Sequence, residues 1–370
     1  PPEGVPQYDG HRAIWIQEYD LRKRKLVGPR RVILDGGVDP STQPIWIEGP
    51  HLYRVNGQYY LVCAEGGTGP NHSQVVLRGR SVWGPFEPYK DNPILTQRDL
   101  PADRPDPITN AGHADLVEAP DGSWWAVFLA TRTYAQKHYN TGRETFLLPV
   151  TWKDGWPVIL EKGKTIPYVA RGPSFMKTGE QKPHTGNFTW RDEFNSETLD
   201  FQWIQVHVPT QAWYDLRKKP GTLTIEPLAV SLSDKVNPSF LARRQQHIAF
   251  DASAAFEVPK SNRVSSGLAA FQSEDYWYFL GSQRVGKELR IFLEKKSGAT
   301  VETVAELRVP RSDRLKLKIA GNGGEYSFFY DTNDQGWQTL KAADDGTILS
   351  TEVAGGFVGA VVGPYARLEK

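Results

Sequence analysis

Short apolar segments alternate with polar turns along residues 1–165, and one hairpin pattern occurs twice. Residues 48–62 read as an apolar strand, an Asn-Gly turn and a second apolar strand. Residues 113–127 repeat this order around an Asp-Gly pair. Both dipeptides favour type I′ turns, because both central residues of such a turn need positive φ. Repeated hairpins with no helical stretch between them predict the blades of a β-propeller.

Glu48 and His113 hold the same place in the two copies. When the turns are aligned, each residue opens the first strand of its hairpin. The innermost strands of a propeller line its central channel, so both side chains are predicted to face one axial site. Residues 11–165 account for about three blades, whereas a propeller typically closes with at least four. We therefore expect these residues to be the C-terminal blades of a larger propeller.

The remaining residues predict a linker and a second all-β domain. Residues 166–186 hold several Pro and Gly among polar residues, which is typical of a linker. Residues 187–370 contain short strands of alternating polarity separated by Gly and Asn turns, which predicts a β-sandwich of jelly-roll type. The expected organisation is all-β, with propeller blades over 1–165, a linker over 166–186 and a sandwich over 187–370.

Composition and charge exclude several classes of partner. With 44 basic and 43 acidic residues the net charge is +1, so there is no electrostatic case for binding nucleic acid or an anionic membrane. No apolar run is long enough to span a bilayer. The single cysteine, Cys63, lies in an apolar strand and is expected to be a buried hydrophobic residue. Glycosylation sequons at Asn71 and Asn187 favour a secreted protein, while a cytoplasmic location stays open.

Six short motifs follow one another along the chain. They are residues 48–53 (EGPHLY), 64–68 (AEGGT), 110–115 (NAGHAD), 142–145 (GRET), 243–247 (RRQQH) and 355–360 (GGFVGA). In order and spacing they resemble glycoside hydrolase family 43, in its β-xylosidase-like members with a C-terminal concanavalin-like sandwich. The resemblance covers nearly the whole chain. It implies a five-bladed propeller and an inverting hydrolysis of xylosides or arabinosides.

The resemblance also implies three axial carboxylates, and Glu48 matches the general acid. The other two would be a general-base Asp and an Asp that tunes the acid. Inversion needs the acid on the leaving-group side and the base on the opposite face of the sugar, ~6.5–9.5 Å away, with a water between base and sugar. The acid must stay protonated near neutral pH, and the tuning Asp would favour that state.

No residue of the chain matches the motif of the base or of the tuning Asp. The four candidates considered and set aside are Asp35, Asp39, Asp106 and Asp115. In the family both residues belong to the first two blades of the propeller. We therefore expect the base on a missing N-terminal part, either a cleaved or a separately encoded fragment that pairs with this chain. The alternative is an inactive truncation.

Four further residues receive roles from the resemblance. Arg143 would bind sugar hydroxyls, for which its planar guanidinium suits it, and Thr68 would lie beside the sugar. His113 would lie near a structural calcium ion and contact it through water, although calcium prefers oxygen ligands. Phe357 would close the pocket from the sandwich. The alternatives are a surface ion pair for Arg143, a turn cap for Thr68, and packing in a core for His113 and Phe357.

Two functions from different classes remain open. The first is an exo-glycosidase that removes terminal β-1,4-xylosyl residues, or α-L-arabinofuranosyl groups, from xylan-derived oligosaccharides. The second is a non-catalytic carbohydrate-binding protein, which the unmatched base favours. Retention of Glu48 and Arg143 favours the enzyme, since a binding module needs no general acid.

Overall fold

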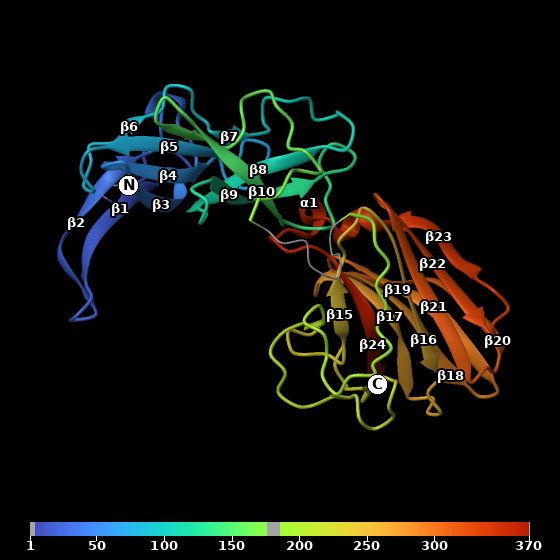
Figure 1. The fold of residues 1–370 in the computed structure, drawn as a ribbon. Helices are drawn as coiled ribbons and strands as arrows, with labels where there is room; N and C mark the ends of the chain where they lie inside the picture. The colour runs from blue at the N-terminus through green and yellow to red at the C-terminus, as the bar shows by residue number, and fades with distance from the viewer. Residues whose placement is uncertain (1–3, 176–185, 370) are drawn as a thin grey trace. The chain divides into compact units, whose positions relative to one another are not determined.

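The computed structural model describes residues 4–175 and 186–369, and it separates into two compact units. We call them the propeller unit (residues 1–133 and 143–179) and the sandwich unit (residues 134–142 and 180–370). Nearly all of their regular secondary structure is β-strand, and the α-helix α1 (Thr351–Ala354) has only four residues (Figure 1). Among the described residues, no helix has the length and apolar character needed to cross a membrane.

The propeller unit is built from consecutive antiparallel sheets. A two-stranded sheet pairs β1 (Ala13–Asp20) with β2 (Lys25–Asp35). The next sheet has β3 (Glu48–Val55), β4 (Gln58–Glu65), β5 (Ser73–Gly79) and β6 (Glu87–Pro88) in that order, and β7 (Leu95–Thr96) also pairs with β5. The last has β8 (Ile108–Glu118), β9 (Trp124–Arg132), β10 (Glu144–Lys153) and β11 (Trp156–Val158). The repeated hairpins are β3–β4 and β8–β9, as predicted, whereas a total of five blades stays a prediction.

The two hairpin turns differ from each other. Asn56 and Gly57 both have positive φ, 50° and 77°, which confirms the type I′ turn in the first copy. In the second copy only Gly122 has positive φ, 78°, and its N–H donates to the carbonyl of Ala119 at 2.9 Å. Pro120 cannot adopt positive φ, so the turn is centred on Pro120 and Asp121. The prediction of a type I′ turn at Asp-Gly was therefore wrong.

Alternate residues of the two main sheets bury their side chains against each other. Val62 and Val76 of the first sheet and Phe128 of the second belong to one core cluster and are at most 2% exposed. Cys63 of β4 is fully buried in a separate cluster that includes Leu61 and Val75, and burial raises the pKa of its thiol. The expectation that Cys63 is a buried hydrophobic residue is confirmed.

The sandwich unit consists of two packed sheets and a short hairpin. The seven-stranded sheet has the order β12 (Ile204–Gln205), β15 (Leu241–Arg244), β24 (Val361–Leu368), β17 (Val264–Ser273), β18 (Tyr276–Val285), β19 (Glu288–Ser297), β20 (Thr300–Pro310). The four-stranded sheet has the order β16 (Ala249–Glu257), β21 (Arg314–Asn322), β22 (Glu325–Thr332), β23 (Gln338–Asp345). The hairpin pairs β13 (Tyr214–Asp215) with β14 (Thr224–Ile225). Buried side chains of both sheets, such as Leu280 and Phe328, form one core.

Residues 134–142 connect β9 to β10 but cluster with the sandwich unit. The Asn140 amide donates to the Gly346 carbonyl at 2.9 Å, and the Asn140 carbonyl accepts from Ala360 N at 2.7 Å. The His138 ring lies 2.9 Å from the Ser350 hydroxyl. The sequence placed this segment within residues 1–165, so its membership of the second unit was not expected. Of the predicted linker 166–186, residues 176–185 lie outside the described residues.

A buried polar cluster ties the two sheets of the sandwich together. The Asp344 carboxylate of β23 accepts from the Lys295 ammonium of β19 at 2.7 Å and from the Tyr278 hydroxyl of β18. The side chains of Asp344 and Lys295 are 10% and 14% exposed. Such a pair is held in place from two sheets, so the loss of one partner leaves the other buried without its counter-charge.

Candidate active site

Glu48 lies at the first position of β3, inside a β-bulge. It pairs with Ala64 of β4, and the register shifts before His51. Gly49 supplies positive φ, 56°, at the bulge. A bulge re-aims the side chain beside it, and here the Glu48 side chain is 30% exposed. Its hydrogen-bond and ion-pair partners among the described residues are Arg12, which donates to Oε2, and His113, whose Nδ1 lies 4.0 Å from Oε1.

His113 is held in an irregular stretch of β8. Its φ is 55°, and that of Asn110 is 56°, between register shifts against β9. The buried Gln74 side chain of β5 clamps this stretch, since its Oε1 accepts from Ala114 N at 2.9 Å and its Nε2 donates to Ala114 O at 3.3 Å. The clamp sits one residue after His113, so it fixes the backbone that points the imidazole toward Glu48.

A second histidine, His72, lies next to His113. Their ring centroids are 6.4 Å apart. His72 is 1% exposed, and its Nδ1 lies 2.8 Å from the Asn110 carbonyl, which can only accept. Burial lowers the pKa of His72, and the nearby charges of His113 and Arg143 act in the same direction while Glu48 opposes them. His72 is therefore a neutral residue near neutral pH. Glu48, His113 and Arg143 are close enough for their charges to act on its pKa.

Three of the predicted site residues thus belong to one region of the propeller unit: Glu48, His113 and Arg143. Thr68 is partly buried in the turn after β4, beside Gly67. Phe357 lies in the sandwich unit between α1 and β24 and is 61% exposed, so packing in the sandwich core, the alternative considered for it, was wrong. The structure leaves the sugar-binding roles of Thr68, Arg143 and Phe357 as predictions.

Three of the aspartates set aside as base candidates serve local structure. Asp35 lies 2.9 Å from the ring of His11. Asp39 accepts from the backbone and hydroxyl of Ser41. Asp115 accepts from the Tyr53 hydroxyl and lies 3.3 Å from the His51 ring. These contacts account for the three carboxylates without a catalytic role.

Metal-ligating side chains do not gather into a cluster in the part of the chain that the structure describes. No group of three or more His, Cys, Asp or Glu side chains within 4–175 and 186–369 is arranged to hold a metal ion. In those ranges, two imidazole nitrogens of the site are buried without a hydrogen-bond partner: His113 Nδ1 and His72 Nε2. Imidazole nitrogens do not suit calcium, which takes oxygen ligands. A calcium ion reached from His113 through water stays a prediction.

Sequence reasoning missed Arg12, His72 and Gln74. In the sequence, His72 is noticeable only as the middle residue of the glycosylation sequon that begins at Asn71. Gln74 is a polar residue directly before the apolar run Val75-Val76-Leu77 of a buried strand, and that contrast could have marked it. A buried polar side chain needs a hydrogen-bond partner, so its presence there indicates a structural or positioning role.

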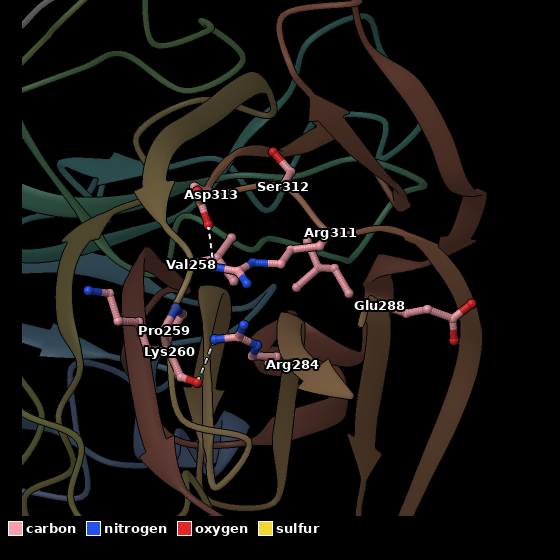
Figure 2. Close-up of a pocket in the computed structure, with 9 residues that line it drawn as sticks. Val258, Pro259, Lys260, Arg284, Glu288, Arg311, Ser312 and Asp313 are labelled. Carbon is pink, nitrogen blue, oxygen red and sulfur yellow. Dashed lines mark hydrogen bonds and ion pairs between the residues drawn. The ribbon is translucent and has the colours of Figure 1, made fainter. Parts of the chain in front are cut away.

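Two cavities have linings that do not include Glu48. A pocket of the sandwich unit is bordered by Arg311, which pairs with Asp313 at 3.2 Å, and by Arg284, which donates to the Lys260 carbonyl (Figure 2). Its volume of about 10 Å³ admits about one water molecule, so it cannot hold a sugar. A cavity of about 470 Å³ in the propeller unit is lined by Gln7, Tyr8, His11, Asp35, Gly36, Pro40 and Gln43.

Comparison with known proteins agrees with this two-part architecture. The family model for glycosyl hydrolases family 43 matches residues 3–157, and the model for the beta xylosidase C-terminal concanavalin A-like domain matches residues 191–369. A non-reducing end alpha-L-arabinofuranosidase of Bacteroides ovatus is 33% identical over 86% of this chain and 59% of its own length. A xylosidase/arabinosidase of Butyrivibrio fibrisolvens is 32% identical over 99% of this chain and 68% of its own.

Solved structures share the fold. A GH43_12 protein retrieved from a capybara gut metagenome superposes with a TM-score of 0.88 at 37% identity, covering 98% of this chain and 68% of that one. The xylan beta-1,4-xylosidase of Bacillus halodurans C-125 gives 0.82 at 26% identity, with 96% and 67% covered. The chain thus spans about 59–68% of the length of these relatives. With a propeller-type unit followed by a concanavalin-like sandwich, the chain belongs to glycosyl hydrolases family 43.

Proposed function

We propose that this protein is an inverting exo-glycosidase that removes terminal β-1,4-xylosyl or α-L-arabinofuranosyl residues from xylan-derived oligosaccharides, with Glu48 as general acid. The observation that carries the proposal is the pairing of Glu48 and His113. Each comes from the first strand of its own sheet, and the carboxylate and imidazole lie 4.0 Å apart. Family relatives named as xylosidases and arabinosidases support the choice of sugar.

In this mechanism Glu48 gives its proton to the glycosidic oxygen as the bond to the leaving sugar breaks. The His113 imidazole and the Arg143 guanidinium donate hydrogen bonds to hydroxyls of the terminal sugar, which fixes the scissile bond against the acid. A water molecule attacks the opposite face of the sugar with help from a base carboxylate. We infer that this base comes from outside these 370 residues, because no residue of the chain matches the motif of the base. Three of the four aspartates considered, Asp35, Asp39 and Asp115, also have local partners.

The same local contacts favour a second candidate, a non-catalytic carbohydrate-binding protein. Both candidates predict affinity for xylo-oligosaccharides, and only the glycosidase predicts turnover. The test uses the native preparation, meaning the chain with any polypeptide that copurifies with it. We expect release of a pentose from xylobiose or from 4-nitrophenyl α-L-arabinofuranoside. Binding without release of any pentose would establish the carbohydrate-binding protein instead.

Gly49 offers a test of the His113 position. A Cβ at Gly49 would lie 2.6 Å from His113 Nε2, so Gly49→Ala must displace the imidazole from its position beside Glu48. We expect kcat/KM on xylobiose to fall by about tenfold or more, because misplacing a positioning group by about 1 Å can cost that much. The measurement is steady-state kinetics of the native preparation carrying the variant.

Gly57→Ala is the matched control, at the other end of the same hairpin. Gly57 also has positive φ, 77°, but a Cβ there meets nothing within 4 Å. Both variants take on the backbone strain of a left-handed alanine, about 1–2 kcal/mol, and only Gly49→Ala should change kcat/KM. Equal kinetics for the two variants would remove His113 from the site.

A further inference from the structure

Trp46, two residues before Glu48, has a backbone conformation that is rare for a bulky residue. Its φ is 54°, in the left-handed region. Hydrogen bonds from two separate segments hold the backbone there: Trp46 N donates to Gly10 O at 2.8 Å, and Gly66 N donates to Ile45 O at 2.9 Å. A left-handed bulky residue that persists in a well-bonded loop is a feature that clusters at functional sites.

The indole of Trp46 connects two predicted site residues. A Cβ at Gly67 would lie 2.2 Å from the Trp46 ring, so the ring rests on the backbone of Gly67, next to Thr68. The Arg12 guanidinium lies 5.5 Å from the centre of the indole, and Arg12 also donates to Glu48. Thr68, Trp46, Arg12 and Glu48 therefore form one continuous line within the propeller unit.

The ring is nevertheless not buried. Trp46 is 42% exposed, although a tryptophan usually contributes most when its large apolar surface is covered. The strained backbone thus keeps part of the apolar ring exposed to solvent, near the arginine that contacts the Glu48 carboxylate. A pentose presents an apolar face of C–H groups, which packs on an aromatic ring in the way that ligand pockets use aromatic side chains.

We propose that Trp46 is a sugar-binding residue whose indole stacks on the leaving-group pentose of the oligosaccharide. The choice of the leaving-group side rests on the proposed function, because a general acid stands next to the oxygen that leaves. Arg12 contacts both the Trp46 ring and the Glu48 carboxylate, so we place Trp46 on the leaving-group side of the scissile bond. It acts on binding of the second sugar and takes no part in proton transfer.

The test measures affinity in an E48Q background, so that no ligand is consumed. Titration calorimetry of the native preparation uses xylotriose and xylose as probes. We expect Trp46→Ala to weaken xylotriose binding by about tenfold, the size of one aromatic stacking contact, and to leave xylose binding unchanged. Trp46→Phe should restore most of the loss. With Glu48 intact, Trp46→Ala should raise the KM for xylobiose more than it lowers kcat.

Trp83→Ala is the matched control. Trp83 is 37% exposed and lies 5.1 Å from the Arg31 guanidinium, but it is remote in sequence from Glu48. Unchanged xylotriose affinity in Trp46→Ala would overturn the proposal, and so would equal weakening of xylotriose and xylose, which would put the ring at the terminal sugar. If the E48Q parent binds neither probe, the proposed function fails and this inference fails with it. Weaker xylotriose binding in Trp46→Ala, with unchanged binding in Trp83→Ala, supports the proposed function and the role of Trp46.

Discussion

Replacing Glu48 with Gln should lower the hydrolysis of xylobiose by about 10²–10⁴-fold, the contribution typical of a general acid. The glutamine keeps the size of the side chain and its contact with Arg12 but carries no proton to give to the leaving oxygen. Affinity for xylotriose should stay within about twofold, because the amide can still accept and donate hydrogen bonds. The measurement is kcat for xylobiose together with calorimetric binding.

The leaving group provides a sharper readout of the same variant. A 4-nitrophenolate departs with little need for a proton, so Glu48→Gln should retain a larger share of activity on 4-nitrophenyl β-D-xylopyranoside than on xylobiose. Asp115→Asn is the control, since Asp115 is an exposed carboxylate on the strand of His113 with Tyr53 and His51 as partners. Full activity of Glu48→Gln on both substrates would refute the acid assignment, and collapse of activity in Asp115→Asn would identify Asp115 as the base.

Replacing Asp344 with Asn should destabilise the sandwich unit by about 3 kcal/mol, the cost typical of breaking a buried ion pair. The change leaves the Lys295 ammonium buried without its carboxylate and weakens the acceptor of the Tyr278 hydroxyl. Calorimetric melting should show a lower transition for this unit. Asp313→Asn is the control, because Asp313 and Arg311 are 85% and 48% exposed and such a surface pair contributes about 0–1 kcal/mol.

The Asp344 effect should depend on pH. Burial alone would raise the pKa of Asp344, but the hydrogen bonds from Lys295 and Tyr278 hold it below its usual value. A carboxyl group with a lowered folded pKa stabilises the fold above its unfolded pKa, about 3.9, and that stabilisation disappears as pH falls through the folded value. The difference in melting temperature between wild type and Asp344→Asn should therefore be constant from pH 7 to 5 and shrink below about pH 4. A difference that grows on acidification would contradict this.

The repeated pattern was enough to predict the hairpins and the common place of Glu48 and His113. Strand period and turn chemistry are local properties, and they specify which residue opens each strand. The conformation of His113 could not be predicted in this way. It depends on Gln74, whose side-chain amide forms hydrogen bonds with the backbone of Ala114, 40 residues further along the chain. Such a contact exists only once the two sheets have packed.

The membership of residues 134–142 in the sandwich unit was also out of reach of sequence reasoning. The segment lies between two strands of one sheet, so its connectivity suggests an ordinary loop of the propeller unit. Several of its partners are backbone groups more than 200 positions along the chain, such as Gly346 O. Backbone acceptors carry no residue-specific signal. Arg12 was missed for a similar reason, because one Arg among 44 basic residues shows its role only through its contacts.

The most direct test of a glycosidase with Glu48 as its acid is the anomeric form of the first product. Proton NMR spectra recorded during hydrolysis of xylobiose by the native preparation distinguish α-xylose from β-xylose before the two equilibrate. An inverting enzyme that cleaves a β-linkage with an acid on one face and a water on the other must release α-xylose first. We expect that signal from the wild type and its loss in Glu48→Gln. Release of β-xylose first, or no release of xylose or arabinose from any of the test substrates, would contradict the account.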